Sequence, residues 1–327
     1  MNFQKLLIVE TADKYLDFAF QSAKKRAEEL SDTHAKDKIS KSKKIESERI
    51  TTARNTLKSH LLNILRVFPQ FDDLPEFYKE LVKITIEYIA LKKSLGAIGW
   101  AYKKVDYFFR EYNVKILKTR DITKINVYRR EFYGRISSVM KQIKNDLVFL
   151  ERARKVMKDY PNVKTSLKTT CIFGFPNVGK STLLGKITDA KPEIKNYAFT
   201  TKRLNLGTYK YNEMKYQFID TPGTFDRFDK MNQIEQQAYL AIKHCCDALI
   251  YVFDITGSYD FKEQFKLLDS LRKTKNDVPI IVYVSKTDMV EKNVTAEFEK
   301  EFKKKYKDIS LFIDQDELVK STIKLLK

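Results

Sequence analysis

The feature that most constrains the fold is a glycine-rich segment, GFPNVGKST, at residues 174–182. A short apolar stretch at 169–173 that favours a β-strand precedes it, and a stretch at 183–188 that favours a helix follows it. This order fits the pattern G-x-x-x-x-G-K-[ST], in which backbone N–H groups of the turn surround phosphate oxygens. The segment therefore predicts a phosphate-binding loop between a strand and a helix.

Apolar runs and helical stretches alternate through the rest of the second half. The continuous apolar runs at 247–253 and 278–284 predict strands that are buried on both faces. Residues 206–211 and 215–219 predict a hairpin. Helical periodicity predicts four further helices, near residues 231–244, 260–274, 295–306 and 315–326. With the loop, this alternation predicts an α/β domain with a mostly parallel sheet over residues 166–327.

In the first half, apolar residues recur every three or four positions, which places them on one face of a helix. Four such runs lie at residues 6–30, 50–68, 81–109 and 132–150. Long helices with short links predict an antiparallel helical bundle over residues 1–165. The pattern leaves 110–130 unassigned, and the basic tract 36–44 predicts an exposed link or a frayed helix end.

The net charge is concentrated in the first half of the chain. Residues 1–168 carry +15 of the total of +19, which predicts an anionic partner for the helical domain. No apolar run approaches the roughly 20 residues that span a bilayer. The three cysteines, Cys171, Cys245 and Cys246, have neither metal nor redox spacing. We therefore expect a monomeric cytoplasmic protein that does not enter membranes.

Each residue of the predicted loop has an expected part in holding a nucleotide. The glycines let the backbone approach phosphate oxygens, Lys180 would reach the β- and γ-phosphates, and the Ser181 hydroxyl would bind Mg²⁺. The expected nucleotide-binding residues of the loop are Gly174, Phe175, Pro176, Asn177, Val178, Gly179, Lys180, Ser181 and Thr182.

Three later segments fit the same kind of site. Asp220-Thr221-Pro222-Gly223 follows the strand near 215–219, so that Asp220 would hold the magnesium shell and the Gly223 N–H would meet the γ-phosphate. Thr200-Thr201 lies before that strand, where a mobile threonine would sense γ-phosphate and Mg²⁺.

The third segment, Ser285-Lys286-Thr287-Asp288, follows the strand near 278–284. Asp288 would accept hydrogen bonds from N1–H and the 2-amino group of guanine, which adenine lacks, so GTP is favoured over ATP. Each of these segments is by itself compatible with an ordinary turn. Their order behind successive strands is what favours a guanine-nucleotide site.

The motifs resemble those of a known family. GFPNVGKST, then YAFTTK at 197–202 and DTPG at 220–223, resembles the Obg-type GTPases of the translation-factor class. NQIEQQA at 232–238, GAIGW at 96–100 and RREFYGR at 129–135 resemble the Nog branch, the nucleolar GTP-binding proteins and their archaeal relatives. The resemblance covers nearly the whole chain. By this resemblance we expect a short archaeal-type relative, without the long C-terminal extension of the eukaryotic members.

The resemblance implies an N-terminal helical bundle, a GTPase domain and a role in large-ribosomal-subunit assembly. By motif position it makes Ser181 and Thr201 magnesium ligands, beside Asp220. Two departures are visible. Ser285 stands where many GTPases have Asn, which predicts weaker guanine affinity, and Ile309-Ser310-Leu311 only suggests the last box, usually Ser-Ala, with Ser310 as its residue.

We expect hydrolysis to depend on positioning by Lys180, Thr201, Gly223 and Asn177. Thr224 stands where Ras-like enzymes have a water-orienting Gln, which predicts slow intrinsic hydrolysis. Asn177 suggests a bound K⁺ that would neutralise charge between the β- and γ-phosphates, in the role of an arginine finger. The alternative is that Asn177 only stabilises the turn through side-chain hydrogen bonds.

Basic and aromatic residues are interleaved over residues 100–135. Cations that contact phosphates and rings that stack on unpaired bases are typical of RNA-binding surfaces. Tyr102 and Phe109 also fit the apolar stripe of a helix core. The favoured interpretation is a GTP-dependent switch that binds ribosomal RNA of the large subunit or its precursor. The alternative is a constitutive RNA-binding scaffold whose nucleotide is structural and scarcely hydrolysed.

Overall fold

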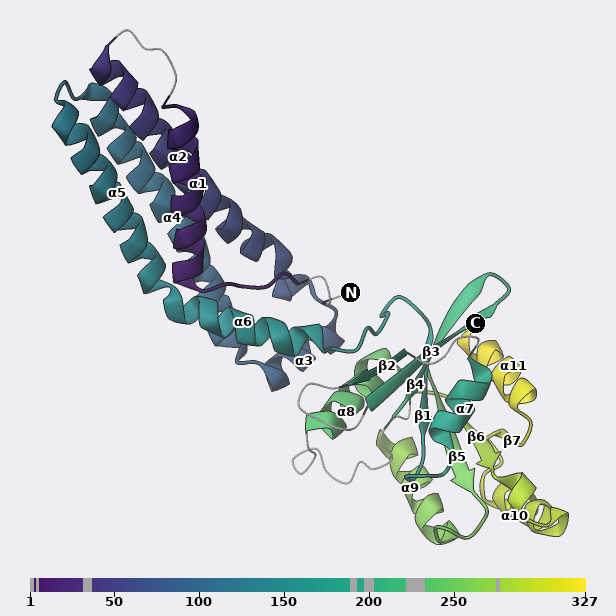
Figure 1. The fold of residues 1–327 in the computed structure, drawn as a ribbon. Coiled ribbons are helices and arrows are strands. Elements are labelled where there is room, and N and C mark those ends of the chain that lie inside the picture. Colours follow the sequence, from purple (N-terminus) through teal and green to yellow (C-terminus); the bar gives the residue numbers. More distant parts are fainter. Residues whose placement is uncertain are drawn as a thin grey trace. The chain divides into compact units, whose positions relative to one another are not determined.

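A computed structural model of the protein describes residue 3 and residues 6–31, 37–188, 193–196, 203–221, 233–274 and 277–327 (Figure 1). Contacts divide the chain into two compact units. The helical unit comprises residues 3–73 and 86–158, and the sheet unit comprises 74–85 and 159–327. The predicted division between residues 165 and 166 remains a prediction.

The helical unit contains α1 (Ala12–Glu29), α2 (Lys38–Val67), α4 (Tyr88–Lys118), α5 (Ile122–Gln142) and α6 (Lys144–Lys158). The first four of these pack lengthwise against one another (Figure 1). Side-chain caps begin three of them, where Thr11, Asp37 and Asp121 accept hydrogen bonds from N–H groups of the first turn. The predicted apolar stripes form the core, with Leu57 of α2 and Ile98 of α4 fully buried. The predicted helical bundle is confirmed.

Two of the predicted helical runs are interrupted, and two segments that the prediction left open are helical. The run 81–109 is interrupted near Ile86, between α3 (Glu76–Thr85) and α4, and the run 132–150 is interrupted at Ile143, between α5 and α6. Residues 38–44 of the basic tract are the first turns of α2, because Asp37 caps that end and the lysines are good helix formers. Most of 110–130, left unassigned, is helical, with a short link at 119–121.

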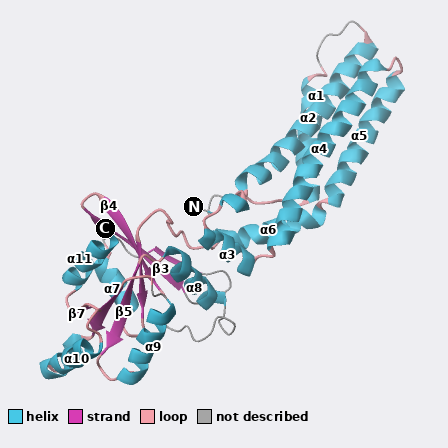
Figure 2. Ribbon diagram, turned by 180° about the vertical axis from the view of Figure 1, so that it is seen from behind, coloured by secondary structure: helices cyan, strands magenta, loops and turns pink. Residues whose placement is uncertain are grey.

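The sheet unit contains seven described strands in the order β2-β3-β4-β1-β5-β6-β7 (Figures 1 and 2). The strands are β1 (Thr169–Phe173), β2 (Glu193–Asn196), β3 (Arg203–Tyr211), β4 (Met214–Asp220), β5 (Ala248–Asp254), β6 (Ile280–Ser285) and β7 (Leu311–Phe312). The helices are α7 (Lys180–Ile187), α8 (Gln233–Cys245), α9 (Phe261–Thr274), α10 (Lys292–Lys305) and α11 (Gln315–Leu326). Only the pairs β2/β3 and β3/β4 are antiparallel, so the predicted mostly parallel sheet is confirmed.

Helices cover both faces of this sheet. On one face α7 and α11 pack over β1 and β5, where Ile172 and Ile250 are buried. On the other face Phe253 of β5 contacts the rings of Phe265 of α9 and Phe298 of α10. Because β1 and β5 are buried throughout, their continuous apolar sequence follows from the two covering layers.

Helix α3 belongs to the sheet unit, although its sequence lies between helices of the helical unit. It packs on α8, and the Tyr78 hydroxyl lies 3.0 Å and 2.9 Å from the carbonyl oxygens of Pro161 and Val163. Burial raises the pKa of Tyr78, as expected for a phenol fixed inside the protein. Within the described ranges, none of the helices combines the length and the apolar character that crossing a membrane requires.

Candidate nucleotide site

The glycine-rich loop joins the end of β1 to the start of α7, as predicted. Gly174 has a φ of 149°, and a Cβ there would lie 2.6 Å from the carbonyl oxygen of Val252. Gly179, with a φ of 97°, is the N-cap of α7. Only glycine fits both positions without strain, which is why the chain can curl tightly around the N-terminus of α7.

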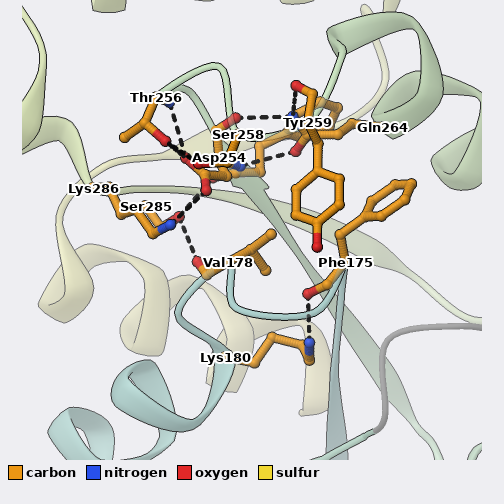
Figure 3. Close-up of polar contacts among 11 residues, drawn as sticks. Phe175, Val178, Lys180, Asp254, Thr256, Ser258, Tyr259, Gln264, Ser285 and Lys286 are labelled. Atoms are coloured by element: carbon orange, nitrogen blue, oxygen red, sulfur yellow. Dashed lines mark hydrogen bonds and ion pairs between the residues drawn. The ribbon is translucent and has the colours of Figure 1, made fainter.

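Lys180 is the first residue of α7 and is buried inside this loop (Figure 3). Its Nζ donates to the carbonyl oxygens of Gly174, at 3.0 Å, and Phe175, at 2.7 Å. Burial lowers the pKa of Lys180, although the carboxylate of Asp220 opposes the shift. A cation in the first turn of a helix, at the positive end of the helix dipole, suits a phosphate group.

Ser181 and Asp220 meet at the side of the loop. The Ser181 hydroxyl donates to Oδ2 of Asp220, and Nδ2 of Asn205 donates to the same oxygen at 3.0 Å. Burial raises the pKa of Asp220, while the hydrogen bonds from Ser181 and Asn205 oppose the rise. Two adjacent oxygen ligands are the chemistry that Mg²⁺ prefers, so this pair fits a magnesium ion.

The sequence prediction missed Asn205, and hairpin register would have found it. Residues 212–213 form the turn, so pairing backwards from Tyr211 and Met214 sets Asn205 opposite Asp220. Thr221, which follows Asp220, is buried, and its hydroxyl donates to the Ile172 carbonyl at 2.8 Å. This bond fastens the start of the Asp-Thr-Pro-Gly segment to β1.

Several predicted site residues lie outside the described part of the chain. They are Thr200, Thr201, Pro222 and Gly223, together with Thr224. Of the remaining loop residues, Pro176, Asn177 and Thr182 are exposed and Val178 is buried. Asn177 has a left-handed backbone with a φ of 59°, a conformation that Asn tolerates better than most residues.

Ser285 connects the predicted guanine segment to the glycine-rich loop. Its buried hydroxyl lies 2.7 Å from the Val178 carbonyl oxygen and 2.9 Å from that of Phe253 (Figure 3). Lys286 follows with a φ of 56° and begins the short 3₁₀ turn Thr287–Met289, on which Asp288 is exposed. The structure thus brings this segment to the same edge of the sheet as the loop.

Another side chain, outside the predicted set, lies at this edge. Asp254, the last residue of β5, is wholly buried and pairs with Nζ of Lys286 at 2.6 Å. Burial alone would raise the pKa of Asp254, but hydrogen bonds from Lys286 and Thr256 outweigh burial and hold this pKa below its ordinary value. An acidic residue ending a seven-residue buried strand was the sequence feature that could have revealed it.

Ser310 is not brought to the site. It stands immediately before β7, and its carbonyl accepts a hydrogen bond from Val282 N near the start of β6. The glycine-rich loop follows the end of β1, and β1, β5, β6 and β7 run in one direction. Ser310 therefore lies at the opposite edge of the sheet from the loop.

Comparisons with known proteins cover both units. Residues 3–164 match the family described as "NOG1 N-terminal helical domain", and residues 169–286 match "50S ribosome-binding GTPase". A Methanocaldococcus jannaschii protein named "Uncharacterized protein MJ1408" is 34% identical over 88% of this chain and 81% of its own length. "Nucleolar GTP-binding protein 1" of Drosophila melanogaster is 30% identical over 88% of this chain. The matched region spans only 44% of the length of that relative.

Among solved structures, Era of Aquifex aeolicus bound to GDP and AlF₄⁻ covers 49% of this chain and 57% of its own, with 26% identity and a TM-score of 0.41. That score is too low to support an argument. The two family matches follow one another along the chain, and the archaeal relative is similar over most of both sequences. The chain therefore belongs to the Nog family of GTP-binding proteins.

Proposed function

We propose that this protein binds GTP and GDP with Mg²⁺, hydrolyses GTP slowly, and acts as a GTP-dependent switch in assembly of the large ribosomal subunit. It would work as a monomer in the cytoplasm and bind ribosomal RNA through its helical unit. The observation that carries the proposal is the convergence of Lys180, Ser181 and Asp220 at the start of α7. The names of the matching family and relatives agree with such a role.

Phosphoryl transfer requires mainly positioning and neutralisation of charge. Lys180 would hold the β- and γ-phosphates, while Ser181, Asp220 and Thr201 would hold Mg²⁺, which offsets negative charge on the same phosphates. Asp288 would select guanine, and Gly223 would donate its N–H to the γ-phosphate. The short side chain of Thr224 cannot orient water as a glutamine does, which supports a slow intrinsic rate.

Asn177 would assist hydrolysis by holding a potassium ion beside the phosphates. Its left-handed backbone equally suits the alternative, in which it only shapes the turn. Asn177→Gly separates the two, because glycine keeps this backbone conformation and removes the side-chain amide. We expect wild-type GTP hydrolysis to be faster in KCl than in NaCl, and the variant to lose that difference. Equal wild-type rates in the two salts would contradict the potassium role.

The RNA-binding surface would lie on α4 and α5 between residues 100 and 135. Seven of its cations are exposed: Lys103, Arg110, Lys118, Arg120, Lys124, Arg130 and Arg135. Tyr107 is 58% exposed, so its ring could stack on an unpaired base. Tyr102 and Phe109 are half-buried, and Lys58 and Arg54 lie over their rings. Lys104 also lies over the ring of Tyr107, so it is their lower exposure that makes Tyr102 and Phe109 poorer candidates for stacking.

Affinity for purified large subunits, measured with GDP and with a non-hydrolysable GTP analogue, tests the switch. We expect tighter binding in one nucleotide state, by a factor of at least about five. Equal affinities in both states, with RNA binding retained, would instead support the alternative of a constitutive scaffold. Its supporting observation is that the basic surface lies wholly in the helical unit, away from the nucleotide residues in sequence.

A further inference from the structure

The loop that follows β5 contacts both segments that would hold the nucleotide (Figure 3). At its start, Oδ2 of Asp254 lies 2.6 Å from Nζ of Lys286, in the predicted guanine segment. At its far end, the ring of Tyr259 lies 4.6 Å, centroid to centroid, from the ring of Phe175 in the glycine-rich loop. The loop thus bridges two segments that are more than 100 residues apart in the sequence.

Asp254 is fixed on every side that the structure describes. Its Oδ1 accepts hydrogen bonds from the N–H and the hydroxyl of Thr256, at 2.9 Å and 2.6 Å. Its backbone N–H and C=O are both bound by the buried side-chain amide of Gln264, which also donates to the Tyr259 carbonyl. A fully buried carboxylate held in this way is an immobile anchor for a cation.

Lys286 is the only ion-pair partner recorded for this carboxylate in the described chain, and it occupies an unfavourable backbone conformation. Non-glycine residues with a φ near 56° persist where surrounding contacts fix them. The side chain of Lys286 is 25% exposed, and its Nζ lies 2.6 Å from the fully buried carboxylate of Asp254. Because Lys286 begins the turn that carries Asp288, fixing Lys286 also fixes that turn.

We infer that Asp254 is a positioning residue for the guanine nucleotide, acting through Lys286 on the turn that presents Asp288. This inference rests on the proposed binding of guanine nucleotides. Asp254 would touch neither base nor phosphate. It determines how long the nucleotide stays bound, and it does not set the rate at which bound GTP is hydrolysed.

The test is the dissociation rate of fluorescent mant-GDP from the full-length chain, for wild type, Asp254→Asn, Lys286→Met and the double variant. Asparagine has the shape of aspartate, and Lys286→Met removes the same ion pair from its more exposed end. We expect each single change to speed dissociation about tenfold, the loss of one charge-assisted hydrogen bond. The double variant should release mant-GDP no faster than the faster single variant, because the two changes remove the same ion pair.

Single-turnover hydrolysis of preloaded GTP should stay within about twofold of wild type in Asp254→Asn, which a general loss of structure would not allow. Lys210→Met, which removes an exposed ion pair with Glu213, serves as the matched control and should leave dissociation unchanged. Unchanged dissociation in Asp254→Asn, or effects that multiply in the double variant, would overturn the inference. Wild-type protein that binds no mant-GDP would contradict the proposed function itself.

Discussion

The sheet unit and the helical unit hold their charged side chains in different ways. In the sheet unit Lys180 and Asp254 are buried, and each has a small set of fixed partners. In the helical unit most cations are exposed and numerous, and residues 1–168 carry most of the positive charge. The difference predicts that the proposed nucleotide chemistry would depend on single residues, whereas the proposed RNA binding would depend on a sum over many.

A half-buried acid in the helical unit, Asp106, has more cationic partners than Asp254. Asp106 accepts hydrogen bonds from Arg54 and Lys58 of α2, and Arg110 of its own helix lies 3.0 Å away. Burial alone would raise the pKa of Asp106, but hydrogen bonds from Lys58 and Arg54 lower it to about 2. Among the described residues Asp106 thus has three cationic partners where Asp254 has one, so the loss of any one cation beside Asp106 is partly compensated.

The largest effect is expected at Lys180. Lys180→Met removes the only buried cation that the structure places inside the glycine-rich loop, so GTP hydrolysis should fall by at least about 100-fold. Phosphate release under saturating GTP measures it. Lys186→Met, at an exposed position of the same helix, is the control and should hydrolyse GTP at the wild-type rate. If Lys180→Met retained hydrolysis, the chemistry of the sheet unit would not depend on this single residue, and the contrast with the helical unit would be wrong.

Glycines provide a second comparison between the units. A Cβ at Gly207 of β3 would lie 2.3 Å from Cγ2 of Thr188, so Gly207→Ala should destabilise the fold by roughly 1–3 kcal/mol. At Gly99, within α4, a Cβ would meet nothing within 4 Å, and Gly99→Ala should be neutral or stabilising by up to about 1 kcal/mol. Urea unfolding of both variants measures the free energies. A stable Gly207→Ala would mean that β3 and α7 can move apart at little cost.

How far the sequence predicted the molecule depends on how local each constraint is. The strand Thr169–Phe173 and the glycine-rich loop were predicted to the residue. The loop requires backbone conformations that only its own glycines adopt without strain, so its sequence is sufficient to predict it. The break near Ile86 was not, because the apolar period continues through it. That break depends on α3 packing against α8 and on Tyr78 bonding to the carbonyls of Pro161 and Val163, about 80 residues away.

In the candidate site, too, the residues of a local motif were predicted and those placed by long-range contacts were not. Lys180 and Ser181 were predicted from a motif of nine residues, and the structure brings Ser181 to Asp220. Asp254 and Asn205 reach the site only through strand pairing, which no short motif records. The error at Ser310 has the same origin, since the direction of β7 decides the edge on which it lies.

The smallest effects of single substitutions are expected on the basic surface between residues 100 and 135. They test whether many cations each contribute a small part of the RNA affinity. Lys118→Gln, Lys124→Gln and Arg130→Gln each remove an exposed cation between residues 100 and 135. Each should weaken binding to a single-stranded RNA oligonucleotide by about two- to threefold, since one phosphate contact among several is lost. Fluorescence anisotropy at several salt concentrations should show the salt slope falling by about 0.7 for each change.

The triple variant should lose affinity by the product of the single effects, because the sites are exposed and independent. Lys25→Gln, an exposed change on α1 outside this surface, is the matched control and should bind as wild type. If one of the three changes alone abolished binding, RNA binding would depend on a single residue, as GTP hydrolysis is expected to depend on Lys180. If Lys25→Gln weakened binding equally, attraction would come from the whole unit and not from α4 and α5. Only graded losses confined to the three positions fit an RNA surface that acts as a sum.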